Sequence, residues 1–527
     1  MERGKAPADS AAPPAVPVVN PWIIAVSVML STFMEVLDTT VVNVSLPHIA
    51  GSLSATIDEA TWTLTSYLVS NAIILPITGW LANHFGRKRM LMTSVIGFTA
   101  ASFLCGLAPG LPFLILCRVV QGACGGGLQP ISQAVLLESF PPRDRGKAMG
   151  FWGLGIVVAP MLGPVLGGWL TDSYSWRWVF YINVPIGVAA IIMTRLFVFD
   201  PPYIRRSSEH VDYWGIGMLA VGIGSLQVVL DKGQEKDWFG THWITALALV
   251  AVVCLSAFVL YELWIEHPVV HLRVFKSRSY STGVFMMAIL GVGLYGSTVL
   301  IPLVLQTLLG YPAVQAGIAM APRGLGSFLA MPLVGIIIAR SDPRKLLAMG
   351  LSVCALTLIQ FSRFNLNAGY WDFFWPQLLM GVSLGFVFVP LTTTTMDPIP
   401  REAMGNATSL FNLVRNLGGS IGISVVETLQ FRQQQVHIGI LGTHVNPFEH
   451  RVQALMSRIQ RGFAIEGSDP VTAGHRAYSA MWGMVLRQAT MMSYNDVFRL
   501  LGVLFLAMLP LIALMRKPKA GGGMAAH

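Results

Sequence analysis

Charged residues are scarce in this sequence: they make up 12% of its 527 residues, against about 25% in a typical soluble domain. Hydrophobic residues make up 54%, and apolar runs of about 20 residues, long enough to cross about 30 Å of hydrocarbon, recur along most of the chain. This composition excludes a soluble multidomain protein. It predicts a single all-α bundle in a membrane, because lipid leaves a spanning backbone little alternative to the helix.

Cysteine is also rare, and the five cysteines all fall inside apolar runs. We therefore expect small packing residues rather than disulfides or a metal site. The sequence contains no Walker loop, no HExxH motif and no clustered Cys/His set, so we expect no metal, no cofactor and no enzyme. Residues 1–21 are rich in Ala and Pro without the apolar core of a signal peptide, which predicts a disordered cytoplasmic tail before an uncleaved first span.

Fourteen apolar runs are long enough to cross a membrane. They lie near residues 22–46, 60–82, 90–108, 112–137, 147–170, 178–198, 213–230, 243–264, 282–308, 314–339, 345–362, 373–395, 404–430 and 496–515. Lys and Arg follow spans 2, 4, 6, 8 and 10, and since these residues accumulate in short cytoplasmic loops, both termini are expected to be cytoplasmic. Topology also accounts for the net charge of +9, so we expect no nucleic-acid partner.

An internal repeat appears when the two ends of the bundle are compared. PITGWLANHFGRK (76–88) resembles PLVGIIIARSDPRK (332–345), with Pro and Gly offset by 256 residues. Repeats of this kind build secondary transporters whose substrate site lies between the halves. The predicted parts are a six-helix half (22–198), two additional spanning helices (213–264), a second six-helix half (282–515) and a cytoplasmic tail (516–527).

Five motifs resemble those of one transporter family. They are LDTTVVNVSLP (37–47), GWLANHFGRK (79–88), LCRVVQG (116–122), GLGIVVAPMLGPVLGG (153–168) and SWRWVFYINVPIG (175–187). In this order, with fourteen spans, they resemble the major facilitator superfamily and, within it, the EmrB/QacA branch of drug:proton antiporters. The resemblance implies the major facilitator fold, a multi-pass location in the cell inner membrane, and proton-coupled export of lipophilic compounds by alternating access. Export of an endogenous lipid or organic acid, nutrient symport and a membrane-embedded transferase remain as alternatives.

The loop after span 2 resembles the family's cytoplasmic gating loop at Gly79, Gly86, Arg87 and Lys88. It departs from that signature at Asn83, where the family usually has aspartate. Asn can still cap a helix, but this difference argues against a salt bridge made by a carboxylate at this position.

Span 5 is apolar but rich in glycine and also contains proline, and these are the two poorest helix formers. Small residues spaced by four form a stripe along which another backbone can approach, and each proline removes one helical hydrogen bond. We expect a packed, pliable seam between the two halves, which in the family marks exporters; the alternative is a tight structural crossing. This antiporter seam consists of Gly155, Ala159, Pro160, Gly163, Pro164, Gly167 and Gly168.

Placing an ionisable residue at the centre of a membrane span costs about 2.5 to 3.5 kcal/mol of insertion free energy, so such residues are functional candidates by default. Glu35 and Asp38 in span 1 are three residues apart and share a helical face. Arg118 in span 4 is the expected partner of Asp38, and both fit family motif positions, whereas Glu35 does not. We predict that these three residues couple transport to protons; a static ion pair, or a merely solvated Glu35, is the alternative.

Three further charged residues are candidates to line the substrate cavity: Arg323, Arg415 and Glu427. The two arginines favour anionic or weakly acidic cargo, whereas the acid favours cations, so the sequence leaves the charge of the cargo open. Arg323 and Glu427 could equally extend to the membrane interface.

Residues 431–495 form a connection between spans 13 and 14 that is much longer than usual. Within EHRVQALMSRIQRGF (449–463), apolar residues recur at helical spacing, which predicts an extracytoplasmic helical insertion. The family resemblance implies that it binds an EmrA-like periplasmic adaptor, which passes cargo to a TolC-like outer-membrane channel. The bundle's own surface and the membrane interface are the alternative sites for its apolar face.

Overall fold

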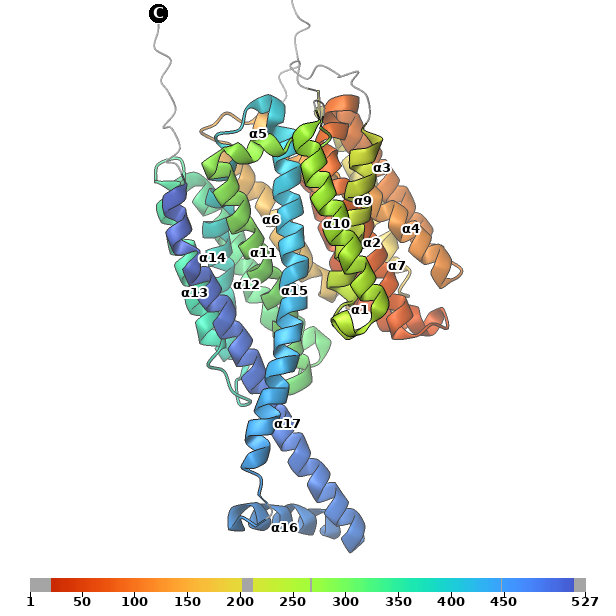
Figure 1. Ribbon diagram of the computed structural model, residues 1–527, viewed down its shortest axis with the longest axis vertical. Helices are drawn as coiled ribbons and strands as arrows, with labels where there is room; N and C mark the ends of the chain where they lie inside the picture. The colour runs from red at the N-terminus through yellow and green to blue at the C-terminus, as the bar shows by residue number, and fades with distance from the viewer. Residues whose placement is uncertain (1–19, 201–211, 266–267, 447, 516–527) are drawn as a thin grey trace, which may run out of the picture.

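The protein is a bundle of long helices with a narrow protrusion at one end (Figure 1). The computed structural model describes residues 20–200, 212–265, 268–446 and 448–515, and all regular elements in these ranges are helical. The all-α prediction is therefore confirmed.

The first half of the bundle contains eight helices that make six crossings, because α4–α5 and α7–α8 each form one span. A methyl group on Gly126, between α4 and α5, would lie 2.6 Å from the carbonyl oxygen of Asn71 in α2, so only glycine permits this approach. The helices are α1 (Pro21–Ser52), α2 (Ile57–Phe85), α3 (Arg87–Gly106), α4 (Leu111–Gly125), α5 (Leu128–Ser139), α6 (Arg145–Ser173), α7 (Trp178–Tyr181) and α8 (Asn183–Phe197).

Two additional helices follow and pack against each other at the side of the bundle. Helix α9 also contacts α2 of the first half and α15 of the second. The elements of this insertion are α9 (Tyr213–Lys232), η1 (Trp238–Gly240), α10 (His242–Trp264) and η2 (Leu272–Lys276).

The second half repeats the arrangement of the first and adds the protrusion. Its elements are α11 (Arg278–Leu303), η3 (Val304–Leu308), α12 (Ala313–Ile337), α13 (Pro343–Phe361), α14 (Tyr370–Met396), η4 (Arg401–Ala403), α15 (Met404–Thr443), α16 (His450–Ile465), α17 (Pro470–Ala507) and η5 (Leu509–Leu514).

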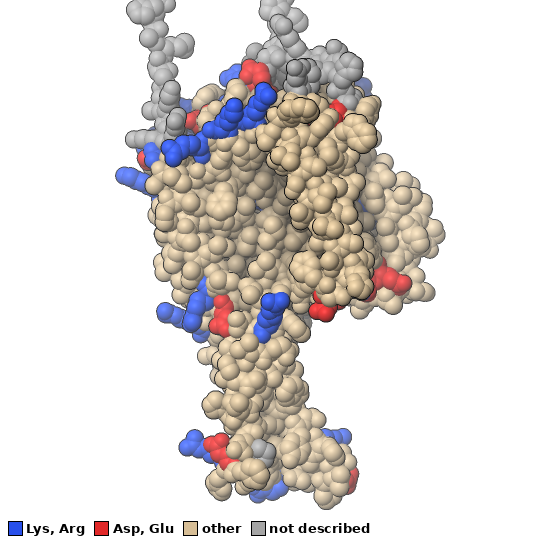
Figure 2. All heavy atoms as spheres, viewed as in Figure 1, with Lys and Arg blue, Asp and Glu red and all other residues tan. Residues whose placement is uncertain are grey.

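Thirteen helical segments of the described chain are long and apolar enough to cross a membrane. The fourteenth expected span, 404–430, lies in α15, which passes through the same bundle (Figure 1). Its polar side chains, including Asn412 and Arg415, are buried among other helices, so this helix does not need an apolar sequence all round. Figure 2 shows the resulting surface: a nearly uncharged wall, with a row of Lys and Arg along the rim opposite the protrusion and side chains of both charges along the rim beside it.

The halves meet where α6 packs on α12 and where α15 packs on α2 and α5. A methyl group on Gly79 of α2 would lie 2.7 Å from the Cα of Asn406 in α15. Asn412 of α15 donates to Gln133 Oε1 of α5 at 2.6 Å. The interface thus combines close backbone contact with buried polar bonds.

The small-residue stripe of α6 does not lie between the halves, and that expectation was wrong. A methyl group on Gly163 would overlap the Thr40 side chain, and one on Gly167 would lie 2.7 Å from the Val41 carbonyl oxygen; both neighbours are in α1. The stripe therefore joins α6 to α1 within the first half. The glycines that face α12 come earlier in α6, such as Gly150, whose methyl group would lie 2.5 Å from the Met331 carbonyl oxygen. A spacing of four residues predicts a close contact but not which neighbour makes it.

The protrusion is built by extending two spanning helices beyond the bundle. Helix α15 continues to Thr443, and α17 is one helix from Pro470 to Ala507, so it includes both the end of the predicted insertion (431–495) and most of the last expected span (496–515). Helix α16 lies across the ends of these two (Figure 1) and has no buried residue.

Candidate functional site: buried charges at the centre of the bundle

The centre of the first half holds a buried ion pair between α1 and α4. Arg118 Nη1 donates to Asp38 Oδ2 at 2.6 Å, and both side chains are 0% exposed. The structure therefore brings together the two residues that the sequence paired. Their part in proton coupling remains a prediction.

Polar residues of the same half complete the bonding of this pair. Asp38 Oδ1 accepts from Gln121 Nε2 at 3.0 Å and from Asn183 Nδ2 at 2.7 Å. Arg118 Nε donates to the Thr63 carbonyl oxygen at 3.0 Å, and its guanidinium lies 4.2 Å from the centre of the Tyr67 ring. Gln121 and Asn183 belong to two of the motifs quoted above. As polar residues inside apolar spans, they could have been identified from the sequence as candidates for this site.

Glu35 lies on the same helix but has different neighbours. It is 4% exposed, and its Oε1 accepts from Asn71 Nδ2 at 3.1 Å. Gln129 of α5 and Arg415 of α15 also interact with the Glu35 carboxylate, and Arg415 Nη2 donates to Gln129 Oε1. This chain of contacts runs from the first half to the second.

The two carboxylates of α1 thus differ in what holds them. The hydrogen-bond partners of Asp38 all belong to the first half, so moving one half against the other leaves them in place. The surroundings of Glu35 include Arg415 of the second half. A relative movement of the halves therefore changes the electrostatic environment of Glu35 directly.

The structure does not gather the three cavity candidates in one place. Arg415 lies between the halves, as described above. Arg323 is 5% exposed in α12 and is therefore enclosed by protein. Glu427 interacts with Asp231 of α9 and with Glu235 in the turn after it, which places it against the inserted helices.

The gating loop has a carboxylate partner that the sequence did not reveal. Arg87 is fully buried and forms an ion pair with Glu138 of α5. Asn83 lies inside α2 and caps no helix, because Gly86, at φ 94°, forms the turn into α3. Asp200, beyond α8, accepts from the Lys88 backbone N–H at 2.7 Å.

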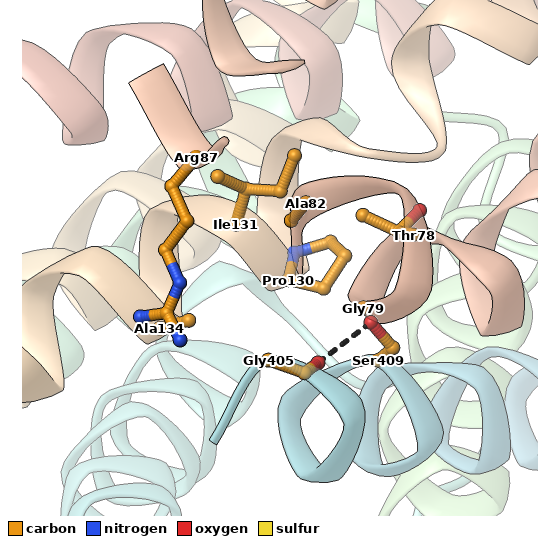
Figure 3. A pocket seen from close by; sticks show the side chains of 9 residues that line it. All are labelled: Thr78, Gly79, Ala82, Arg87, Pro130, Ile131, Ala134, Gly405 and Ser409. Atoms are coloured by element: carbon orange, nitrogen blue, oxygen red, sulfur yellow. Dashed lines mark hydrogen bonds between the residues drawn. The ribbon is translucent and has the colours of Figure 1, made fainter. Parts of the chain in front are cut away.

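A small hollow beside Arg87 lies between residues of the two halves (Figure 3). Figure 3 shows the Arg87 side chain beside residues of α2 and α5, with Gly405 and Ser409 of α15 opposite them. The lining residues are Thr78, Gly79, Ala82, Arg87, Pro130, Ile131, Ala134, Gly405 and Ser409.

One stretch, GVSLG (381–385), has the GxSxG spacing of a serine-hydrolase nucleophile. That chemistry requires a sharp turn between a strand and a helix. Here Ser383 is buried in the middle of α14, and its hydroxyl donates to the Met380 carbonyl oxygen at 2.7 Å. The GxSxG spacing therefore does not indicate a catalytic serine in this protein.

Comparison with known proteins defines the class. Residues 28–423 match the sequence profile of the Major Facilitator Superfamily. The chain belongs to this superfamily and is a transporter, not an enzyme. Among solved structures it resembles that titled "Crystal structure of the human organic anion transporter MFSD10 (TETRAN)", with a TM-score of 0.56 and 12% identity, over 92% of this chain and 100% of that one. This likeness supports the fold alone.

Relatives similar over nearly their whole length confirm the EmrB-type resemblance. The chain is 39% identical over 501 residues to "Multidrug export protein EmrB" of Haemophilus influenzae, covering 94% of this chain and 96% of the relative. It is 37% identical over 508 residues to the protein of that name in Escherichia coli K12, covering 96% and 98%. It is also 37% identical over 517 residues to "Fatty acid resistance protein FarB" of Neisseria gonorrhoeae, covering 97% and 99%.

Proposed function

We propose that this protein is a proton-coupled antiporter that exports lipophilic drugs and related toxic compounds across the inner membrane by alternating access. The observation that carries the proposal is the pair of buried carboxylates three residues apart in α1. Asp38 is held within its own half, whereas Glu35 interacts electrostatically with Arg415 of the opposite half. The relatives named for multidrug export support the direction of transport and the kind of cargo.

The proposed cycle uses the two carboxylates differently. Arg415 interacts electrostatically with Glu35 while the halves are in contact here. Because a buried carboxylate without a nearby cation takes up a proton more readily, separation of the halves favours protonation of Glu35. Asp38 keeps its ion pair with Arg118 when the halves separate, and this pair breaks only when α1 and α4 move apart. Each proton that descends about 100 mV supplies about 2.3 kcal/mol, which supports a roughly fiftyfold cargo gradient.

The protrusion provides the proposed link to the rest of an export system. Helix α16 bears apolar residues at helical spacing but has no fully buried residue; Leu455 is 40% exposed, and the other apolar residues of this face are only partly covered. It lies opposite the rim that carries the Arg-rich loops, which the positive-inside rule assigns to the cytoplasm together with both termini. We therefore assign the protrusion to the periplasm, where an EmrA-like adaptor and a TolC-like channel would receive cargo.

A second candidate cargo is a lipophilic acid. The relative named for fatty acid resistance favours it, at 37% identity over nearly the full chain. This alternative changes the cargo and leaves the proposed antiport mechanism as it stands.

Proton movement during cargo uptake tests the mechanism. Purified protein is placed in liposomes that contain a pH-sensitive dye, and tetraphenylphosphonium or dodecanoate is added outside. An antiporter that takes cargo in releases protons outward, so the lumen becomes alkaline beyond the change in protein-free liposomes. A symporter makes the lumen more acidic, and either acidification or the absence of a protein-dependent pH change with both compounds contradicts the proposal.

A further inference from the structure

Four arginines are buried in the described part of the chain, and they differ in their partners. They are Arg87, Arg118, Arg323 and Arg415. Arg87 forms an ion pair with Glu138, and Arg118 forms one with Asp38. Arg415 donates to Gln129 Oε1 and interacts electrostatically with Glu35.

Arg323 has hydroxyl partners in place of a carboxylate. Its Nη1 donates to Thr298 Oγ1 at 3.2 Å and its Nη2 to Ser297 Oγ at 3.3 Å, both in α11. Cys354 of α13 also lies near the guanidinium, and it contributes a thiol and not a carboxylate. Hydroxyls satisfy the donors of a guanidinium but do not neutralise it, and an uncompensated buried charge is strongly unfavourable.

The internal repeat shows that the second half lacks an acid corresponding to Asp38. The offset of 256 residues that relates Pro76 to Pro332 places Arg323 at the position of Tyr67, whose ring lies against the guanidinium of Arg118. The same offset places Leu294 at the position of Asp38. Each half therefore has a buried arginine near the middle of its bundle, but only the first half supplies an acid at the corresponding position of its first helix.

We propose that Arg323 is a specificity-determining residue that binds the acid group of an amphipathic cargo molecule, so that cargo supplies the missing negative charge. The Ser297 and Thr298 hydroxyls hold the guanidinium in place until the carboxylate or phenolate of the cargo displaces them. The arginine is 5% exposed, so cargo reaches it when the halves open. This inference rests on the proposed export function and identifies the cargo class that the second half selects.

Equilibrium binding tests this inference without any proton gradient, so failure of proton coupling does not affect the result. Dodecanoate and its neutral analogue dodecanol are titrated into the purified full-length protein in a neutral detergent at pH 8, with tryptophan fluorescence as the signal. We expect the wild type to bind dodecanoate at least about tenfold more tightly, since a charged hydrogen-bonded contact is worth roughly ten- to hundredfold in affinity. Arg323→Gln removes this preference and leaves dodecanol binding unchanged.

Two further variants make the test specific. Arg323→Lys keeps the charge and retains part of the preference, whereas Arg363→Gln, which removes an exposed arginine, leaves the preference intact. Equal affinity of the wild type for the two compounds overturns the inference even if Arg323→Gln fails to fold. Retention of the full preference by a folded Arg323→Gln protein overturns it as well.

Discussion

Replacing Asp38 by Asn removes the negative charge from a fully buried ion pair and leaves Arg118 without a carboxylate. The two groups are 2.6 Å apart and 0% exposed. Breaking a buried pair by removing one partner costs about 3 to 5 kcal/mol, because the remaining charge is desolvated and unpaired. We therefore expect Asp38→Asn and Arg118→Gln each to lower the free energy of unfolding by about this amount.

The double variant separates stability from function. With both charges gone, Asp38→Asn/Arg118→Gln should recover most of the lost stability, since no isolated charge remains. Unfolding of all four proteins is measured by heat in detergent, and cargo transport is measured in proteoliposomes with an imposed pH gradient. Proton-driven transport should be absent from both single variants and from the double variant. Normal transport by Asp38→Asn, or single variants as stable as the wild type, would refute this reasoning.

Three further predictions concern the helix contact, the second carboxylate and the protrusion. Gly163→Leu should block transport by displacing α1, at a cost in stability of about 1 to 3 kcal/mol or more. Gly168→Leu should transport normally, because a methyl group there would make only an ordinary contact, 3.9 Å from Val44 Cγ1; equal activity of the two variants would contradict this reasoning. Glu35→Gln should flatten the pH dependence of the transport rate with little loss of thermal stability, and an unaltered pH profile would count against its role. Deletion of residues 440–490 with a short bridge should preserve exchange in proteoliposomes but abolish cellular resistance and co-purification with an adaptor, and unchanged adaptor binding would exclude the docking role.

The sequence predicted the architecture well, because hydropathy and the internal repeat are properties of the chain itself. It also paired Asp38 with Arg118, since both stand in recognisable motifs of neighbouring spans. Polar residues in apolar segments, such as Asn71, Gln129 and Asn183, carried a weaker signal. Which of them meet depends on how each helix is rotated about its axis, and a single sequence does not state that rotation.

Two expectations differ from the structure, each for its own physical reason. The stripe through Gly163 predicted close packing, but α6 has small residues on more than one side, and α1 rather than the other half occupies this one. The last span was expected to begin near residue 496, where hydropathy rises, although α17 runs without a break from Pro470. Hydropathy reports where a helix enters apolar surroundings, which is not where the helix begins.

Coupled exchange of protons and cargo is the central claim, and the steady-state distribution of a cargo that does not itself titrate tests it most directly. Proteoliposomes with an acidic lumen are given radiolabelled tetraphenylphosphonium on both sides, with the membrane potential clamped at zero by potassium and valinomycin. Antiport predicts accumulation in the acidic lumen, approaching about tenfold per pH unit for each proton exchanged, and depletion when the gradient is reversed. Accumulation on the alkaline side, or protein-dependent transport with a distribution that ignores the pH gradient, would contradict proton antiport.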